Sequence, residues 1–589
     1  MSEKLLPYFV QELQTIQNDF ALFAKAHPEV ANSLGINQDS IDDPQITRLI
    51  ESVAFLNGRL QQRLDSAFPE FSEHLLNVLY PNFLRPIPAY SLLEFRCNGD
   101  VNATHHIPKN TQFDIKNSEE DSHLFRTAEA LTLHPLCLIE FKIERAPLSQ
   151  TGIAPASADA LIELTIKTTD DSLSIANLGI DELKLHLKGD SYACLQLYDI
   201  LSTDLLKIVI GDDKNHWELD LQNMTPVGFD VKDHLLPYQA ASFDGFKLLT
   251  EFLMFLERFH AFRFDLKSLL AKIEGNAFSI RFFLRELNAD FARNLSINNF
   301  SLFSVPIVNL HSLVAEPVKI TFTESHYPLI LDANKPTGIA LFSIDEVLDV
   351  THGDKISVPQ IYNEKYQPAK IGLRWQLVES QNSTGHNQYL LKVADLEHIS
   401  DINQPRTWTV KATVLNVSTV AQLGHQSHIE CQDSLTIPAS LSLLRRPSLP
   451  INHNEHRHNT WALLQHLHCN YQTLLGCDDP VGALKEVLNL YNHQHNSHIN
   501  AFIESLISIE QQPFTAPIRV DGKNCFAFGT RIVVTLSAHH GMSLFAQLLN
   551  HFFAHFAGFH SFTQLDIKLE GHDGYYLQFP RKSGCKILN

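Results

Sequence analysis

Residues 43–64, DPQITRLIESVAFLNGRLQQRL, carry the pattern that decides how the chain begins. Apolar residues recur every three or four positions, at Ile46, Leu49, Ile50, Val53, Leu56, Leu60 and Leu64. This spacing places them on one face of an α-helix, and most charged residues fall on the other face. Asp43 and Pro44 suit an N-cap followed by proline at the first helical position. The segment therefore predicts a long amphipathic helix.

A similar stripe precedes this segment. Its members are Leu6, Val10, Leu13, Ile16, Phe20 and Phe23. Pro28 ends the predicted helix, because the residue before a proline is pushed out of the helical region. A third, shorter helix is expected from about Pro69 to Tyr80, and the proline-rich run YPNFLRPIP at 80–88 marks a boundary.

These two stripes need a further apolar surface to cover them. The simpler explanation is packing within a domain of the same chain. The alternative is a mixed bundle with the helices of a partner protein. The helical pattern leaves both explanations open.

From Ser91 to Leu444 the pattern becomes typical of β-structure. Short alternating or β-branched runs at 92–96, 161–166 and 183–187 are separated by Gly, Asn, Asp and Pro. Helical patches interrupt them at 192–206 and 245–256, and a new β-rich unit begins near Pro317.

The region after Pro447 mixes both kinds of element. A polar, His-rich stretch at 452–459 precedes expected helices at 461–468 and 481–491, strands at 518–520 and 532–536, and an amphipathic helix across 544–559. The sequence thus predicts an α+β multidomain protein, with an N-terminal helical bundle segment at 1–90, β-rich domains at 91–316 and 317–450, and an α+β C-terminal domain at 451–589.

Composition narrows the classes of function. The 589 residues carry a formal charge of −20, which disfavours nucleic acid and anionic lipid as partners. Eight cysteines form no C-x-x-C pair and the N-terminus has no signal-peptide pattern, so we expect a cytoplasmic protein. The stretch between Arg531 and Asp566 has no charged residue, but histidines, Gln547 and Asn550 interrupt it. We therefore expect a core-facing helix there and no membrane insertion.

Motifs for catalysis are missing from the sequence. It contains no phosphate-binding glycine loop, no H-E-x-x-H, no G-x-S-x-G and no kinase motif set. We predict no enzyme and no catalytic, cofactor-binding or metal-binding residue. Histidine is abundant, with 31 residues, and it clusters at 453–458, 466–469 and 493–498. A metal-dependent hydrolase and a ligand-binding β-rich module therefore remain the alternatives.

Several stretches resemble the TssF family, also called VasA or ImpG, of type VI secretion systems. The resemblance covers nearly the whole chain. It rests on YFVQEL at 8–13, HP at 27–28, DP at 43–44 with RLIESVAFL at 48–56, PVGF at 226–229, LLPY at 235–238, FKLLTEF at 246–252, PIVNL at 306–310 and SFTQL at 561–565. Departures include Leu256 in place of proline, Arg531 in place of glycine and His560 in place of asparagine.

The resemblance implies a structural role, similar to that of the wedge subunits in contractile-phage baseplates. Two copies would join one TssG, with TssK and TssE bound, around a VgrG-like spike that receives the sheath. The baseplate would lie at the cytoplasmic face of the inner membrane. The resemblance also favours the partner bundle, whose interface would comprise Leu13, Ile16, Phe20, Phe23, Leu49, Val53, Leu56, Leu60 and Leu64.

Overall fold

The computed structural model describes most of the chain, in two compact units that are treated separately below. The first unit comprises residues 1–78 and 456–464, and the second comprises 79–455 and 465–589. The described residues are 6–29, 44–65, 75–76, 80–97, 101–117, 121–149, 152–212, 215–238, 242–336, 338–361, 372–381, 387–395, 404–417, 420–424, 427–433, 435–451, 474–494, 496–520, 523–557, 561–583 and 586–587.

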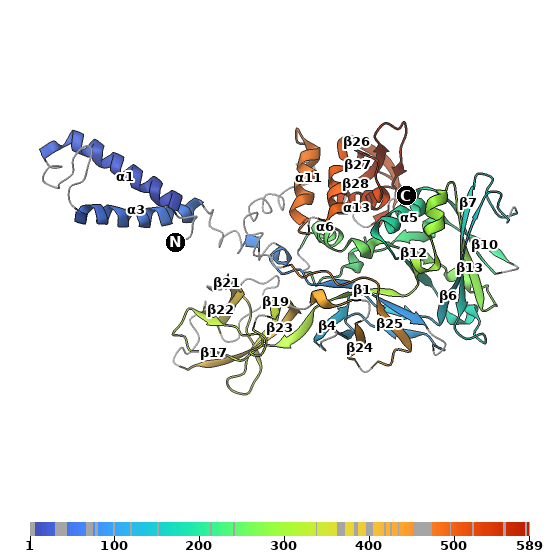
Figure 1. Ribbon diagram of the computed structural model, residues 1–589, viewed down its shortest axis with the longest axis horizontal. Helices are drawn as coiled ribbons and strands as arrows, with labels where there is room; N and C mark the ends of the chain where they lie inside the picture. Colours follow the sequence, from blue (N-terminus) through green and yellow to red (C-terminus); the bar gives the residue numbers. More distant parts are fainter. Residues whose placement is uncertain are drawn as a thin grey trace. The chain divides into compact units, whose positions relative to one another are not determined.

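In the first unit, two helices pack along each other (Figure 1). They are α1 (Leu6–Ala26) and α3 (Pro44–Asp65). Both predicted helices are confirmed, and Pro44 is the first residue of α3. The third predicted helix lies largely outside the described residues. Within its predicted range, residues 75–76 are described and are helical.

The second unit contains a six-stranded sheet that joins distant parts of the sequence. In spatial order its strands are β24 (His428–Cys431), β3 (Gln112–Lys116), β4 (Ser122–Thr127), β15 (Ser304–Val308), β1 (Tyr90–Cys97) and β25 (Ala439–Leu443). Strands β24 and β25 pair with β3 and β1. Strand pairing therefore links the expected 91–316 and 317–450 domains.

Three further antiparallel sheets lie within residues 105–301. One contains β10 (His216–Leu219), β9 (Leu205–Gly211), β13 (Ala277–Leu284), β7 (Ala160–Thr168) and β6 (Leu136–Arg145). Another contains β11 (Met224–Pro226), β12 (Ala261–Asp265), β8 (Glu182–Leu187) and β14 (Phe300–Ser301). The smallest pairs β2 (His105–Ile107) with β5 (Leu131–Leu133). The helices in this region are α5 (Ser191–Thr203), α6 (Asp244–Met254), α7 (Lys267–Leu270) and α8 (Ala289–Asn294).

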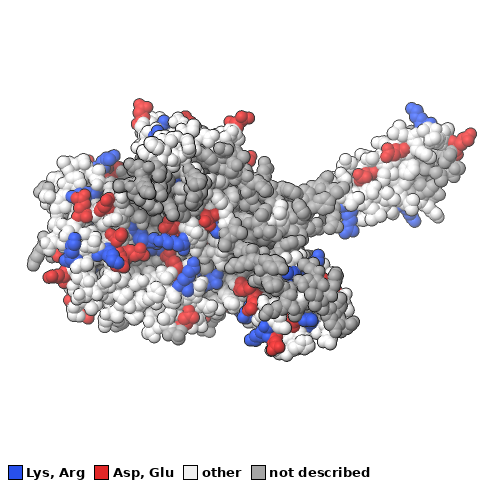
Figure 2. Space-filling model, turned by 180° about the vertical axis from the view of Figure 1, so that it is seen from behind, with Lys and Arg blue, Asp and Glu red and all other residues white. Residues whose placement is uncertain are grey.

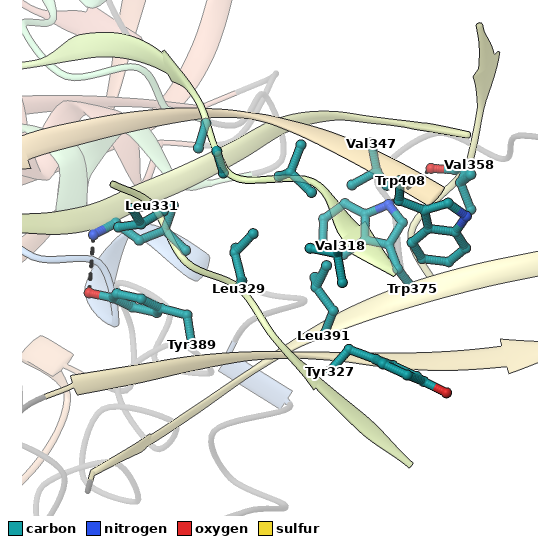
Figure 3. Packing of buried hydrophobic residues seen from close by; sticks show 14 of the residues in the cluster. Val318, Tyr327, Leu329, Leu331, Val347, Val358, Trp375, Tyr389, Leu391 and Trp408 are labelled. Carbon is teal, nitrogen blue, oxygen red and sulfur yellow. Dashed lines mark hydrogen bonds between the residues drawn. The ribbon is translucent and has the colours of Figure 1, made fainter. Parts of the chain in front are cut away.

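Two sheets enclose a separate hydrophobic core (Figure 3). The first contains β16 (His311–Val314), β17 (Val318–Ile320), β23 (Arg406–Asn416), β19 (Ile339–Asp349) and β20 (Ile356–Ser357). The second contains β18 (His326–Pro328), β22 (Asn387–Asp395) and β21 (Leu373–Gln381). Trp408 is fully buried between them. The Tyr389 hydroxyl accepts a hydrogen bond from the Leu341 backbone N–H at 3.0 Å, which is the dashed line in Figure 3. Because β16 and β17 both pair with β23, pairing also crosses the expected boundary at 316.

The C-terminal region is mixed α and β, as predicted. Its sheet contains β26 (Leu506–Val520), β27 (Lys523–Leu536), β28 (Ser561–Leu569), β29 (Leu577–Gln578), β30 (Lys582–Ser583) and β31 (Lys586–Ile587). Its helices are α11 (Pro480–Tyr491), α12 (Ser497–Glu504) and α13 (Met542–His555). Strands β27 and β28 are parallel, and α13 connects them. The expected helix at 461–468 lies outside the described residues.

Helix α13 differs from its expected amphipathic form. Asn550 and His551 lie off the apolar stripe of an amphipathic helix, but both are buried. The cause is a second covering surface, because α5 and α6 pack on α13 in addition to β28. The Lys582 ammonium lies 2.9 Å from His551 Nε2, and the Phe229 ring stacks on the imidazole.

Candidate partner interface

Helices α1 and α3 meet through one face of α3, which includes two small residues. Ile50, Ala54 and Gly58 are buried and follow one another at intervals of four residues, so they form one face. A Cβ atom at Gly58 would lie 3.0 Å from the Phe9 backbone nitrogen and 3.1 Å from the Tyr8 carbonyl carbon. A side chain at this position would therefore press on the α1 backbone unless the two helices moved apart by a few tenths of an ångström.

A different face of α3 is uncovered. The exposed fractions are 66% for Leu49, 43% for Val53, 64% for Leu56 and 59% for Leu60. Their spacing of four, three and four residues is the heptad spacing of a coiled-coil seam. No side chain among the described residues covers this face, which we call the α3 stripe.

The predicted interface residues of α1 have a mixed environment. Leu13, Ile16 and Phe20 are half-buried, and Phe23 is 36% exposed. The side chain of Leu64, on α3, lies outside the described residues. The structure thus separates the predicted set into an exposed α3 stripe and a partly covered row on α1. Sequence reasoning left out the exposed Leu6, Val10 and Leu22, although the first two belong to the periodic pattern.

Uncharged residues cover most of the helix pair on the face seen in Figure 2, with isolated acidic and basic side chains between them. White marks every uncharged residue in that view, whether polar or apolar. The apolar character of this surface therefore rests on the exposed fractions of the α3 stripe. An uncovered apolar stripe is typical of the core of an obligate interface.

In the second unit, the stretches that carry the family resemblance meet around one buried ion pair. Glu251 and Arg258 are at most 1% exposed, and the guanidinium donates to the carboxylate. The same carboxylate accepts hydrogen bonds from the backbone N–H groups of Leu235 at 2.8 Å and Leu236 at 3.3 Å. Arg258 also donates to the Asp233 carbonyl.

The electrostatics of Glu251 fit a structural role. Burial alone raises the pKa of this carboxyl, but the Arg258 charge and the Leu235 N–H hold the pKa below its usual value. Beside the pair, the Phe229 ring packs on Phe252 and Phe259 at centroid distances of 6.3 Å and 4.9 Å. The motif residues therefore build a filled core around a buried ion pair, in which Arg258 Nε has no hydrogen-bond partner among the described residues.

Another buried carboxylate also has a structural explanation. Asp199 accepts hydrogen bonds from the backbone N–H groups of Gly541 at 2.6 Å and Ser543 at 2.9 Å, at the N-terminus of α13. Burial raises its pKa to about 6. Asp199 thus fixes α13 to α5, and its position explains the shifted pKa without a catalytic role.

The histidine groups do not form a metal centre among the residues that the structure describes. No cluster of three or more His, Cys, Asp or Glu side chains there is placed to hold a metal ion. Residues 452–473, which contain two of the groups, lie outside the described residues, and the His493 ring packs against Phe83. In the same described parts, no helix is both long and apolar enough to cross a bilayer.

Comparisons with known proteins agree on one family. The family model for TssF of the type VI secretion system matches residues 1–586. The type VI secretion system component TssF1 of Pseudomonas aeruginosa is 24% identical over 620 aligned residues, with full coverage of both chains.

Two solved structures share the fold. A chain of the type VI secretion system TssK-TssF-TssG baseplate subcomplex matches with a TM-score of 0.74 and 19% identity, over 92% of this chain and 99% of that one. A chain of the baseplate complex from the type VI secretion system matches with a TM-score of 0.60 and 20% identity, over 99% and 100%.

Proposed function

The chain belongs to the TssF family of type VI secretion system proteins, and from that premise we propose that it is a structural wedge subunit of the baseplate. Two kinds of support converge. Both structures that share its fold are baseplate assemblies. The described residues also offer an uncovered apolar stripe on α3, which a partner helix can bury.

The observation that carries this proposal is the α3 stripe. Burying a leucine or valine side chain contributes about 1.5–3 kcal/mol when it starts fully exposed. The four side chains of the stripe start about half to two-thirds exposed, so covering them is worth roughly 4–7 kcal/mol. A helix with heptad spacing is the partner that such a stripe fits best.

The partners follow from the family. The α3 stripe takes helices of a TssG-like protein and of a second copy of this chain, in a complex with two copies of the chain and one TssG. TssK and TssE bind the resulting wedge, and the wedges surround a VgrG-like spike and receive the sheath. The complex assembles in the cytoplasm, at the inner membrane, without a catalytic step by this chain.

A charge on the α3 stripe tests the proposal. The variant Leu56→Asp, co-expressed with the TssG-like protein of the same genome, is expected to bind it at least about 100-fold more weakly, because a buried unpaired carboxylate costs several kcal/mol. Asn57→Asp is the matched control, since it adds the same charge at the next residue, which is exposed but outside the stripe.

Mass measurement of the purified complexes gives the readout. The wild-type chain and Asn57→Asp are expected to yield a species with two copies of the chain and one TssG-like protein, whereas Leu56→Asp yields a folded chain alone. An unaltered complex with Leu56→Asp would refute the role of the α3 stripe.

A further inference from the structure

A small polar cavity of the second unit lies where four distant segments of the chain meet. Its volume is about 130 Å³, and it is partly enclosed. The polar part of its wall includes Tyr90 on β1, Glu257 in the 3₁₀ turn that follows α6, Arg446 after β25, and Gln494 and Asn496 before α12. Pockets for drug-sized ligands start at about 300 Å³. The cavity therefore suits water or one small ion.

The charged side chains of the wall leave one positive charge unpaired. They are Arg445, Arg446 and Glu257, in a chain whose formal charge is −20. Arg445 is already bound, because it donates to Glu257 Oε1 at 3.4 Å, to Ser191 Oγ at 3.0 Å and to the Gly189 carbonyl at 3.1 Å. Arg446 is exposed, and its guanidinium forms no ion pair or hydrogen bond with any described residue. A free guanidinium favours an anion, above all an oxyanion that can accept two of its N–H groups.

Uncharged hydrogen-bond donors line the same cavity. The Ser448 hydroxyl accepts a hydrogen bond from the Tyr90 N–H at 2.9 Å, so its own proton can go to another acceptor. The Asn496 carbonyl oxygen caps α12 by accepting from the His498 N–H at 3.0 Å, which leaves its NH₂ group as a donor. The N-terminus of α12 adds a positive partial charge.

A buried hydroxyl in the wall lacks a partner. Tyr90 is 4% exposed, and its hydroxyl forms no hydrogen bond within the described parts of the chain. The charges of Glu257 and Arg445 both act on the pKa of this hydroxyl, which burial raises, so the hydroxyl lies near the charged part of the cavity wall. Buried polar groups in proteins are almost always paired with protein, water or a ligand. The Tyr90 hydroxyl is therefore a further candidate donor.

Glu257 decides which anion the cavity can accept. Its Oε1 accepts from Arg445, whereas its Oε2 has no hydrogen-bond partner among the residues that the structure describes. A carboxylate repels an anion unless the anion brings a proton that it can donate. Phosphate keeps an O–H at neutral pH, whereas sulfate has no proton and can only accept. Several donors beside one free acceptor therefore fit a protonated phosphate better than sulfate.

We propose that this cavity binds inorganic phosphate, which Arg446 and the neutral donors hold through its oxygens and which donates its proton to Glu257 Oε2. The wall residues come from the six-stranded sheet, the end of α6 and the start of α12, so the bound ion is expected to tie these three elements together. The site lies within the second unit and needs no partner protein, so the inference is independent of the proposed function.

Hydrogen exchange of the full chain tests the inference. The chain is compared in potassium phosphate and in potassium sulfate at pH 7 and equal ionic strength, because both salts stabilise folded proteins in general. Peptides covering 90–97, 253–260 and 444–451 are expected to exchange about tenfold more slowly at a phosphate concentration ten times the Kd, which calorimetric titration supplies. Sulfate is expected to bind at least about tenfold more weakly, because it cannot donate to Glu257.

Two variants test the roles of the charged residues. Arg446→Gln removes the free guanidinium and is expected to weaken phosphate binding at least about tenfold. Arg293→Gln is the matched control, since it removes the same charge from a side chain that is 78% exposed outside the cavity, and it is expected to have no effect. Glu257→Gln replaces the acceptor with an amide, so sulfate is then expected to bind as well as phosphate. Peptides of β21 and β22 show whether each variant keeps its fold, because they belong to a separate core.

Four results would overturn the inference. Equal protection of the wild-type chain by phosphate and sulfate would mean that both act only as stabilising salts. Protection that Arg446→Gln leaves unchanged would place the phosphate elsewhere. Exchange that does not respond to phosphate would mean that water alone fills the cavity. Stronger binding of glycerol 3-phosphate than of the free ion would assign the site to a phosphate ester. None of these results bears on the proposed function, which the Leu56→Asp complex tests separately.

Discussion

The buried pair of Glu251 and Arg258 allows a quantitative test of what holds the second unit together. The substitution Glu251→Leu removes the carboxylate and leaves the guanidinium in a site where it is 1% exposed. Removing one partner of a buried ion pair costs about 3–5 kcal/mol, because the remaining charge is uncompensated. The backbone N–H groups of Leu235 and Leu236 also lose their shared acceptor.

The double substitution Glu251→Leu/Arg258→Met separates these contributions. It removes both charges and replaces them with apolar groups, a change that is often close to neutral for buried ion pairs. The two N–H groups still lack an acceptor, which costs about 1–3 kcal/mol for each group that water does not reach. The double variant is therefore expected to be more stable than Glu251→Leu, yet about 2–6 kcal/mol less stable than the wild type when water reaches neither N–H group.

Hydrogen exchange is the suitable assay, because a chain of 589 residues with two units does not unfold in one step. In Glu251→Leu, peptides within 229–259 are expected to exchange roughly 10²–10³-fold faster. Peptides of β21 and β22 serve as the internal control, since their buried residues belong to a separate core. If the double variant exchanges as fast as the single one, the stranded charge is not the cause and the reasoning fails.

The remaining predictions concern the helix pair and pH. Gly58→Val is expected to force α1 and α3 apart, because its Cβ would lie 3.0 Å from the Phe9 nitrogen. The variant should then show faster hydrogen exchange in residues 6–26 and weaker binding to the TssG-like protein. An exchange rate equal to that of the wild type would contradict this prediction. Burial lowers the pKa of His260 to about 3 and of His311 to about 4. Below pH 6.5 these histidines bind protons in the unfolded chain but not in the folded chain. The free energy of unfolding present above pH 6.5 therefore decreases as the pH falls towards 4. The loss is about 2 kcal/mol per histidine at pH 5. Thermal unfolding should show this slope and a shallower one in His260→Gln/His311→Gln; equal slopes would count against it.

The helix pair shows what the sequence pattern can and cannot predict. The periodicity of large apolar residues located α1 and α3 correctly, because it reports on helical geometry alone. It assigned Ile50 to the same stripe as Leu49 and Leu56, whereas the structure places Ile50 on the inner face. The inner face depends on Ala54 and Gly58, and small residues carry no signal in a pattern that counts large ones.

Non-local contacts explain the other differences. Strands β24 and β25 return to β3 and β1, and nothing in their local sequence identifies partners some 300 residues earlier. Strands β26 and β27 were predicted only at 518–520 and 532–536, because polar residues and Pro513 interrupt the alternation in 506–517.

The two units differ in how much of their stability is internal. The second unit encloses Trp408, the Glu251–Arg258 pair and many phenyl rings, all buried by residues of the same chain. Among the described side chains of α1 and α3, only Ala24, Ile50 and Ala54 are buried apolar groups. So small a core does not offset the conformational entropy of ordering two helices of 21 and 22 residues. If the chain acts as the proposed wedge subunit, the helix pair gains most of its stability when a partner covers the α3 stripe, and we propose that its folding and the assembly of the wedge are coupled equilibria.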